Sequence, residues 1–208
     1  MARYTGPACK LCRRVEEKLF LKGERCLSPK CAIEKRHGPP GDRRFSRRRP
    51  SDRAIQLKEK QKGRFMYGVL ERQFSKYFEK SQKANGVTGE LLLQWLERRL
   101  DNVVYRLSFA ESRKQARQFV LHGHFTVNSH RVNIPSFSVK PGDIIKWHPN
   151  RAGSDFVKIA VTDLPKREVP SWLNLNTTSL EGEILSLPEI SDIDTKIDTR
   201  LIVEYYSK

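Results

Sequence analysis

The chain has 208 residues, enough for one large domain or two small domains with cores of their own. Lys and Arg number 40 against 24 Asp and Glu, and the formal net charge of +16 calls for a polyanionic partner. No run of about 18 apolar residues occurs, which excludes a membrane-spanning helix, and the first residues lack the apolar stretch of a secretory signal. We therefore expect a cytosolic protein that binds nucleic acid.

The excess of positive charge is confined to the first three quarters of the chain. Residues 1–50 hold 15 basic and 5 acidic side chains, residues 51–100 hold 11 and 6, and residues 101–150 hold 7 and 3. Residues 151–208 reverse the balance, with 7 basic and 10 acidic side chains. The polyanion is therefore predicted to lie against the first 150 residues, and the C-terminal stretch to face another partner.

Four cysteines, the only ones in the chain, lie within 23 residues and read C-x2-C-x13-C-x4-C. Two close pairs joined by a short loop suit thiolates that converge tetrahedrally on one Zn²⁺. Such a zinc would be structural, because four sulfur ligands leave no position for an activated water. Disulfides and an iron–sulfur cluster are the alternatives, and the lack of an export signal disfavours disulfides. The predicted ligands are Cys9, Cys12, Cys26 and Cys31.

Basic side chains crowd the cysteine segment, and we expect Arg13, Arg14 and Lys22 among them to contact RNA. Residues 35–53 are predicted to form a loop or extended arm, because Pro39-Pro40-Gly41 interrupts helix. Its arginines would repel one another unless phosphates neutralised them. A solvated tail is the alternative, but the run lies between two segments predicted to be ordered, which favours RNA contact. These arginines are Arg43, Arg44, Arg47, Arg48 and Arg49.

Two helices are predicted next. Ser51 and Asp52 can cap a helix over roughly residues 52–62, which carries the candidate RNA contacts Lys58 and Lys62. The second helix covers residues 69–83, where apolar side chains recur on one face. Both helices are therefore expected to pack one side on a core and to expose the other.

A third helix is predicted to start at Thr88, after the helix breaker Asn85-Gly86. It continues through apolar residues spaced three and four apart, which are expected to form core and not to hold a cofactor. They are Leu92, Trp95, Leu96, Leu100, Val103 and Leu107.

A helix–turn–strand unit follows. Ser112 caps its helix, Gln115 completes a capping box, and Gly123 ends the helix. The helical spacing predicts that three cations share one exposed face as a compact patch. They are Arg113, Lys114 and Arg117.

Short strands are predicted on both sides of a turn at residues 128–130. A type II turn at residues 140–143 leads into a strand over residues 144–147. The acidic tail closes on an apolar run with period-two alternation at residues 201–205, which predicts a final strand.

The sequence RLDNVVYRLSFAESRKQARQFVLHGHFTVNSHRVNIPSFSVKPGD, residues 99–143, resembles the S-four RNA-binding domain. In that module two helices pack on a small β-sheet, and the second helix with its following turn faces structured RNA. Pseudouridine synthases, tyrosyl-tRNA synthetases and small heat-shock RNA binders share it. The resemblance implies RNA contact by Arg113, Lys114, Arg117, His122 and His124, and Arg131 is a further candidate.

The chain as a whole resembles the S-four family of bacterial small-subunit ribosomal proteins, in its zinc-binding type. This likeness is carried by MARYTGPACKLCRR, RRPSD (48–52), LKEKQK (57–62), YGVLERQF (67–74) and LIVEYYSK. It implies an α+β fold with three parts: a zinc-bearing, mainly helical domain over 1–97, an S-four domain over 98–165 inserted before a C-terminal strand, and a segment 166–208 that returns to the first domain. The segments 36–48 and 189–198 depart from the pattern.

The resemblance also implies a function on the ribosome in the cytoplasm. Members are primary binders of 16S rRNA that nucleate folding of its 5′ domain. They contact the fifth small-subunit protein, lie near the channel by which mRNA enters the subunit, and influence decoding accuracy.

Other functions are weighed against this one. A stand-alone S-four-domain RNA-modifying enzyme would need a catalytic carboxylate such as Asp101 or Asp143, but no separate catalytic domain remains to hold it. A zinc-bearing DNA regulator would need a recognition helix, which the cysteine segment does not offer. No catalytic triad or phosphate-binding loop motif occurs, so we expect no enzyme. Trp147 and Trp172 could either stack on unpaired bases or belong to a core.

Overall fold

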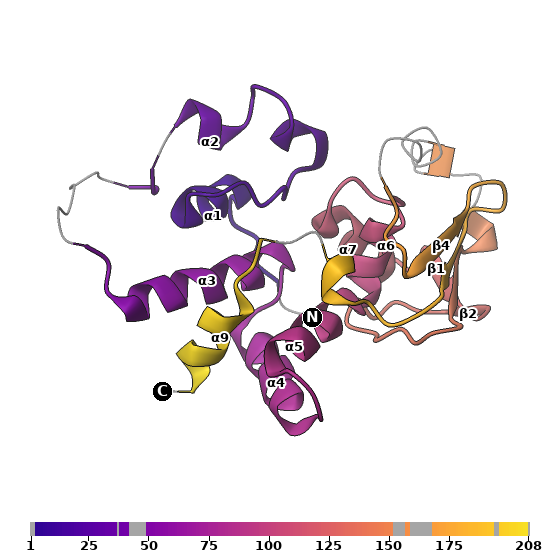
Figure 1. The fold of residues 1–208 in the computed structure, drawn as a ribbon. Coiled ribbons are helices and arrows are strands. Elements are labelled where there is room, and N and C mark those ends of the chain that lie inside the picture. Colours follow the sequence, from indigo (N-terminus) through magenta and orange to yellow (C-terminus); the bar gives the residue numbers. More distant parts are fainter. Residues whose placement is uncertain are drawn as a thin grey trace. The chain divides into compact units, whose positions relative to one another are not determined.

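The computed structural model describes residues 3–36, 38–41, 49–151, 157–158, 168–193 and 196–207. The chain forms two compact units (Figure 1). The first unit combines the residues up to Leu92 with the last helix, and the second holds the described residues from Leu93 to Ile193. The first is helical and the second contains an antiparallel sheet, so the predicted α+β fold class is confirmed.

Helices and a 3₁₀ turn build the first unit. Ser51 Oγ accepts a hydrogen bond from the N–H of Ala54 at 3.3 Å, so the predicted N-cap is confirmed. None of the described helices is long and apolar enough to cross a membrane. The elements are α1 (Ala8–Val15), the 3₁₀ turn Gly23–Cys26, α2 (Ala32–Lys35), α3 (Asp52–Met66), α4 (Glu71–Lys83), the first half of α5 (Thr88–Glu97) and α9 (Thr199–Tyr206).

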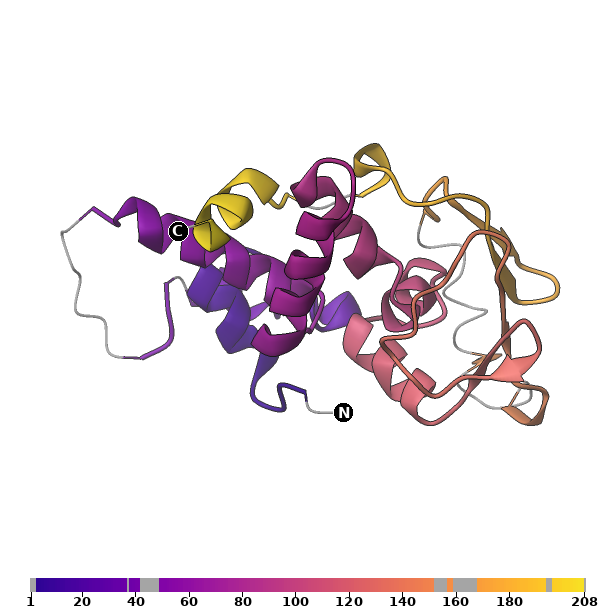
Figure 2. The same ribbon diagram turned by 90° about the horizontal axis from the view of Figure 1, so that it is seen from below.

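The last element, α9, is a helix, and the predicted C-terminal strand is wrong. Asp198 Oδ1 accepts the N–H of Arg200 at 2.9 Å and caps the helix. The helix buries Ile202 completely, and its Tyr206 ring stacks on Phe78 with centroids 4.4 Å apart. In so short a segment, the alternation typical of a strand cannot be told apart from the i, i+4 spacing typical of a helix, which Ile202 and Tyr206 show. Packing on the rest of the unit decides for the helix. Figures 1 and 2 both show α9 lying along α3.

Where the spacing predicts one helix from Thr88, the structure has two, α5 and α6 (Leu100–Arg106). Arg99 is extended between them, with φ −70° and ψ 135°. The N–H of Leu100 donates to the carbonyl of Phe137 at 2.8 Å, so a distant segment supplies the hydrogen bonds that a continuous helix would make. The predicted core residues of both helices are buried, except Trp95, which is half-buried.

Five antiparallel strands form the sheet of the second unit, in the order β2-β1-β3-β5-β4. The central strand β3 pairs on both sides, because Ile145 lies opposite Val127 and Gly182. The segment predicted to return to the first domain, 166–208, is therefore divided, since β4 and β5 belong to this sheet and α9 to the first unit. Besides α6, the elements are α7 (Arg113–Leu121), β1 (Phe125–Val127), β2 (His130–Arg131), β3 (Ile144–Trp147), β4 (Leu173–Asn176), β5 (Glu181–Ile184) and 3₁₀ turns at Pro149–Arg151 and Ile190–Asp192.

Both predicted turns of the second unit are confirmed. Asn128 and Ser129 have φ values of 49° and 69°, as the tight turn between β1 and β2 requires. Gly142 has φ +86°, and the N–H of Asp143 donates to the carbonyl of Lys140 at 3.1 Å before β3 begins.

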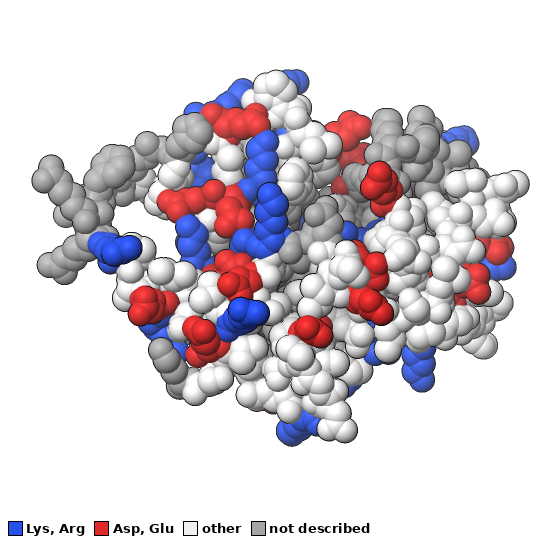
Figure 3. Space-filling view, viewed as in Figure 1, with Lys and Arg blue, Asp and Glu red and all other residues white. Residues whose placement is uncertain are grey.

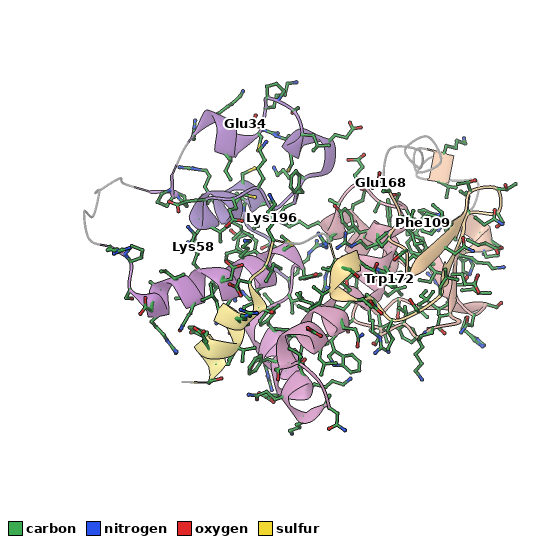
Figure 4. The ribbon with its side chains drawn as sticks, in the orientation of Figure 1. Glu34, Lys58, Phe109, Glu168, Trp172 and Lys196 are labelled. Atoms are coloured by element: carbon green, nitrogen blue, oxygen red, sulfur yellow. The ribbon has the colours of Figure 1, made fainter. Side chains whose placement is uncertain are left out.

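Aromatic side chains form the centre of the core between the sheet and α6 and α7. The Trp147 ring lies 4.5 Å from that of Phe125 and 5.8 Å from that of Phe109. Trp172 is 1% exposed in the same cluster (Figure 4). Trp147 and Trp172 are therefore core residues, and neither ring is accessible for stacking on a base.

Candidate RNA-binding site and cysteine cluster

Helix α7 is the element that the sequence analysis predicts to face RNA, and its start is capped. Ser112 Oγ accepts the N–H of Gln115 at 3.3 Å, as predicted. The Gln115 side chain instead accepts the N–H of Glu111 at 2.8 Å, so the predicted capping box is wrong in its second half. The cap fixes where the helix begins, and with it the direction of the cations in its first turn.

The end of α7 is a left-handed glycine cap, as predicted. Gly123 has φ +66°, and the N–H of His124 returns to the carbonyl of Phe119 at 3.1 Å. Arg131 reaches across from β2 and donates to the carbonyls of Gly123 at 3.2 Å and His122 at 3.1 Å. Its charge lies at the negative end of the helix dipole, so this candidate RNA contact also stabilises the helix end.

Arg117 does not share an exposed face with its neighbours, so the predicted three-residue patch is wrong. It is 6% exposed, and its Nη1 donates to Oδ2 of Asp101 at 2.9 Å. Arg99 holds the same carboxylate through two bonds, of 3.1 Å and 2.8 Å. Arg117 therefore links α7 to α6. Asp101 has the structural role that the sequence favours over a catalytic one.

Arg113 and Lys114 are the two cations of α7 that do reach the surface. Lys114 is exposed, whereas Arg113 is partly buried. The Arg113 Nε donates to Oδ1 of Asn102 at 2.7 Å, and its guanidinium lies 4.6 Å from the centre of the Tyr105 ring. Asn102 and Tyr105 are site residues that the sequence analysis misses, because their helical spacing marks them only as neighbours of the core.

The two candidate histidines differ in their surroundings. His122 is exposed and shares a 2.9 Å hydrogen bond with Gln118, so it can meet a ligand. His124 is buried, and burial lowers the pKa of its imidazole, as do the charges of Arg151, His122 and Arg131. The ring of His124 packs beside those of Phe119 and Trp147 in the core. RNA contact by His124 stays a prediction.

In the first unit Arg13 anchors a loop. Its Nε donates a hydrogen bond to the carbonyl of Gly38, and its Nη2 donates one to the carbonyl of Pro39, both at 3.1 Å. Arg14 and Lys22 are exposed, as a role in RNA contact requires. Arg49 is exposed as well. The other predicted arginines of the arm lie outside the described residues: Arg43, Arg44, Arg47 and Arg48.

The two lysines predicted on α3 have different environments. Lys58 is exposed and pairs with Glu16 at 2.6 Å (Figure 4). Lys62 is 5% exposed and pairs with Glu17 at 2.8 Å and Glu59 at 3.3 Å, so its charge is used inside the first unit. RNA contact by Lys62 stays a prediction. On the face of this unit seen in Figure 3, Lys and Arg side chains lie beside Asp and Glu, and the surface there is mixed in sign.

The four cysteines lie in α1, the 3₁₀ turn and the start of α2, and no disulfide joins any two of them. Burial raises the pKa of the Cys12 thiol, and the negative charges of Cys26, Cys9 and Cys31 raise it further. The N–H of Lys22 donates to Sγ of Cys26 at 3.3 Å. In the part of the chain that the structure describes, no three Cys, His, Asp or Glu side chains are arranged to hold a metal ion.

A pocket of about 290 Å³ lies between α3 and α9. It is lined by the carboxylates of Asp52 and Glu204, the apolar side chains of Ile55 and Leu201, and the amide of Gln56. The Gln56 Nε2 donates to Oε2 of Glu204 at 2.9 Å, while its buried Oε1 has no hydrogen-bond partner among the described residues. The pocket therefore has a negatively charged lining beside apolar side chains.

Comparisons with known proteins agree with this arrangement. A family model described as "Ribosomal protein S4/S9 N-terminal domain" matches residues 3–97, and one described as "S4 domain" matches residues 98–145. Similar relatives include small ribosomal subunit protein uS4A of Symbiobacterium thermophilum, 53% identical, and small ribosomal subunit protein uS4 of Gloeobacter violaceus, 56% identical. That of Thermodesulfovibrio yellowstonii is 50% identical, and all three matches cover 100% of both chains. The chain therefore belongs to the uS4 family of bacterial small-subunit ribosomal proteins, whose members are structural proteins and not enzymes.

Proposed function

We propose that this chain is a structural component of the small ribosomal subunit in the cytoplasm. It binds 16S rRNA directly and nucleates assembly of the 5′ domain of that RNA. The observation that carries the proposal is identity of 50–56% over the full length of relatives named as small-subunit proteins. The net charge of +16 supports it, because a polyanion must compensate that charge.

Binding is a grip on phosphates by cations on both units. The exposed Arg14, Lys22 and Arg49 serve on the first unit, and Lys114 with Arg113 at the start of α7 on the second. Each phosphate that a cation neutralises releases a counterion, and the fold selects the RNA by its shape. Buried cations such as Arg117 and Lys62 contribute to the fold that displays these groups.

Titration of the purified chain with a transcript of the 16S 5′ domain tests the proposal. Across a series of KCl concentrations, log K should fall with log salt by roughly 0.7 to 0.9 per phosphate contacted. Lys114→Ala should make this slope shallower by about one such step. Lys196→Ala removes the same charge from the acidic C-terminal part and should leave the slope unchanged. A slope near zero, or equal affinity for an unrelated folded RNA, would refute specific rRNA binding.

The proposal also places a neighbouring small-subunit protein, the fifth in particular, against the pocket between α3 and α9. The acidic lining and the unpartnered Gln56 Oε1 favour a Lys or Arg side chain of that neighbour. Glu204→Lys should abolish binding of the purified fifth protein in calorimetry, while Glu79→Lys, at an exposed site on α4, should not. A place near the path of mRNA and an influence on decoding accuracy are further parts of the proposal, and they rest on the likeness to the family. They predict a changed frequency of misreading in a reporter assay with Glu204→Lys.

A structural Zn²⁺ held by Cys9, Cys12, Cys26 and Cys31 is part of the proposal. Four thiols in one small segment are a donor set typical of zinc. Because the described structure does not bring three of them together into a metal-binding group, binding would have to draw the four sulfurs closer. The backbone N–H that donates to Cys26 Sγ is the kind of contact that supports a metal-bound thiolate. The metal would order the cysteine segment and its exposed cations.

A further inference from the structure

A buried carboxylate lies beneath the RNA-facing start of α7. Glu97 is 0% exposed, and its two carboxylate oxygens accept hydrogen bonds from Arg106. The Arg106 Nη2 donates at 2.8 Å and the Nε at 3.0 Å. This two-bond pair cancels the charge of Glu97 and fixes the plane of its carboxylate.

Asn102 links this carboxylate to Arg113. Its Nδ2 donates to Oε2 of Glu97 at 2.5 Å and to the Glu97 carbonyl at 3.0 Å. Because the amide nitrogen faces these two acceptors, the amide oxygen must face the other way, where it accepts the Arg113 Nε–H at 2.7 Å. Asn102 is 2% exposed, so water does not compete for these bonds.

The guanidinium of Arg113 is thus held on two sides, by the amide oxygen of Asn102 and by the ring face of Tyr105 at 4.6 Å. Asn102 is neutral, so it orients Arg113 without cancelling its charge. Holding a cation in place before its ligand arrives lowers the entropy cost of binding.

We propose that Asn102, itself fixed by Glu97, is a positioning residue that preorganises Arg113 to contact an RNA phosphate. This role rests on the proposed binding of 16S rRNA. It predicts that Asn102→Ala weakens binding about 3- to 10-fold, the effect of leaving one long side chain to be ordered on binding. A purely structural role for Asn102 would lower stability without acting through Arg113.

A double-mutant cycle separates the two roles, with affinity for the 16S 5′-domain transcript measured at temperatures where every variant is folded. The loss caused by Asn102→Ala should disappear in an Arg113→Ala background, because the positioned group is absent there. In a Lys114→Ala background the loss should persist in full, since the hydrogen bonds of Asn102 run to Glu97 and Arg113. Equal losses in all three backgrounds would overturn the positioning role.

Arg113→Lys supplies a second measurement that leaves the buried residues intact. Lysine keeps the charge but lacks the Nε–H that Asn102 holds. Binding should weaken about 3- to 10-fold and become insensitive to Asn102→Ala. Wild-type affinity in Arg113→Lys would overturn the proposal. If the wild-type chain did not bind the transcript at all, the proposed function would be overturned together with the positioning role. If the wild-type chain bound but the variants behaved otherwise than stated, only the positioning role would be overturned.

Discussion

Arg117 Nη1 lies 2.9 Å from Oδ2 of Asp101, and both side chains are buried in the second unit. Arg99 pairs with the same carboxylate, so one buried negative charge holds two buried positive charges. A cation that the sequence places next to the RNA-facing residues of α7 therefore joins two helices. Replacing it together with Arg113 and Lys114 would change the fold as well as RNA binding.

The two partners in this pair are expected to differ in how much their loss destabilises the protein. Asp101→Ala removes the carboxylate that both buried arginines hold and should lower the free energy of unfolding by about 3–5 kcal/mol. Arg117→Met leaves Asp101 bonded to Arg99 and fills much of the same volume, so it should cost on the order of 1 kcal/mol. Urea unfolding monitored by circular dichroism measures both. Equal losses would show that the carboxylate does not organise the cluster.

Two glycines should respond in opposite directions to replacement by alanine. Gly123 has φ +66°, and a Cβ there would lie 2.3 Å from the Arg131 Nε, so Gly123→Ala should destabilise by about 1 kcal/mol or more. Gly63 lies inside α3, where a Cβ would meet Ile197, Ile202 and Phe74 at an ordinary 3.7 Å. Gly63→Ala should therefore stabilise by roughly 0.5–1 kcal/mol, because alanine favours helix. Thermal unfolding gives the sign of each change, and a destabilised Gly63→Ala would contradict the packing of α9 on α3.

His124 should make stability depend on pH. Burial, followed by the charges of Arg151, His122 and Arg131, lowers its pKa in the folded chain below the usual 6.5. As pH falls below 6.5, the unfolded chain binds a proton that the folded chain does not, so the free energy of unfolding decreases until the lower folded pKa is passed. Above pH 6.5 the contribution is constant.

Urea titrations at pH values from about 7.5 to about 5.5 test this dependence, in a range where carboxylates stay ionised. His124→Phe keeps an aromatic ring in the core and should flatten the curve. His130→Gln, at the exposed start of β2, is the matched control and should leave the slope as in the wild type. A wild-type curve that rises on acidification would contradict the lowered pKa.

Metal content tests the cysteine cluster. Elemental analysis of the purified chain should find about one Zn²⁺ per molecule. Cys12→Ser should lose it, whereas Ser28→Ala in the same segment should retain it. Removal of the metal with a chelator should expose the cysteine segment to protease and leave the second unit protected. Iron in place of zinc would indicate a cluster, and full protection after chelation would show that the segment folds without metal.

Local features of the sequence correctly predict local structure. The caps at Ser51 and Ser112, the glycine at position 123 and the turn at residues 140–143 are all found, because each depends on bonds between residues a few positions apart. The sequence also identifies the family, because the motifs that carry the resemblance are read directly from the chain and need no knowledge of its fold.

Only the tertiary structure decides which cations face outward. Lys58 and Lys62 lie one turn apart on the same helix, but only Lys62 is buried, where its ammonium meets the carbonyl of Lys196, 134 positions further along the chain. The break between α5 and α6 and the helical form of the C-terminus are decided in the same way, by hydrogen bonds and packing with distant segments. Helical spacing describes neighbours within a turn, whereas burial depends on contacts that only the folded chain brings together.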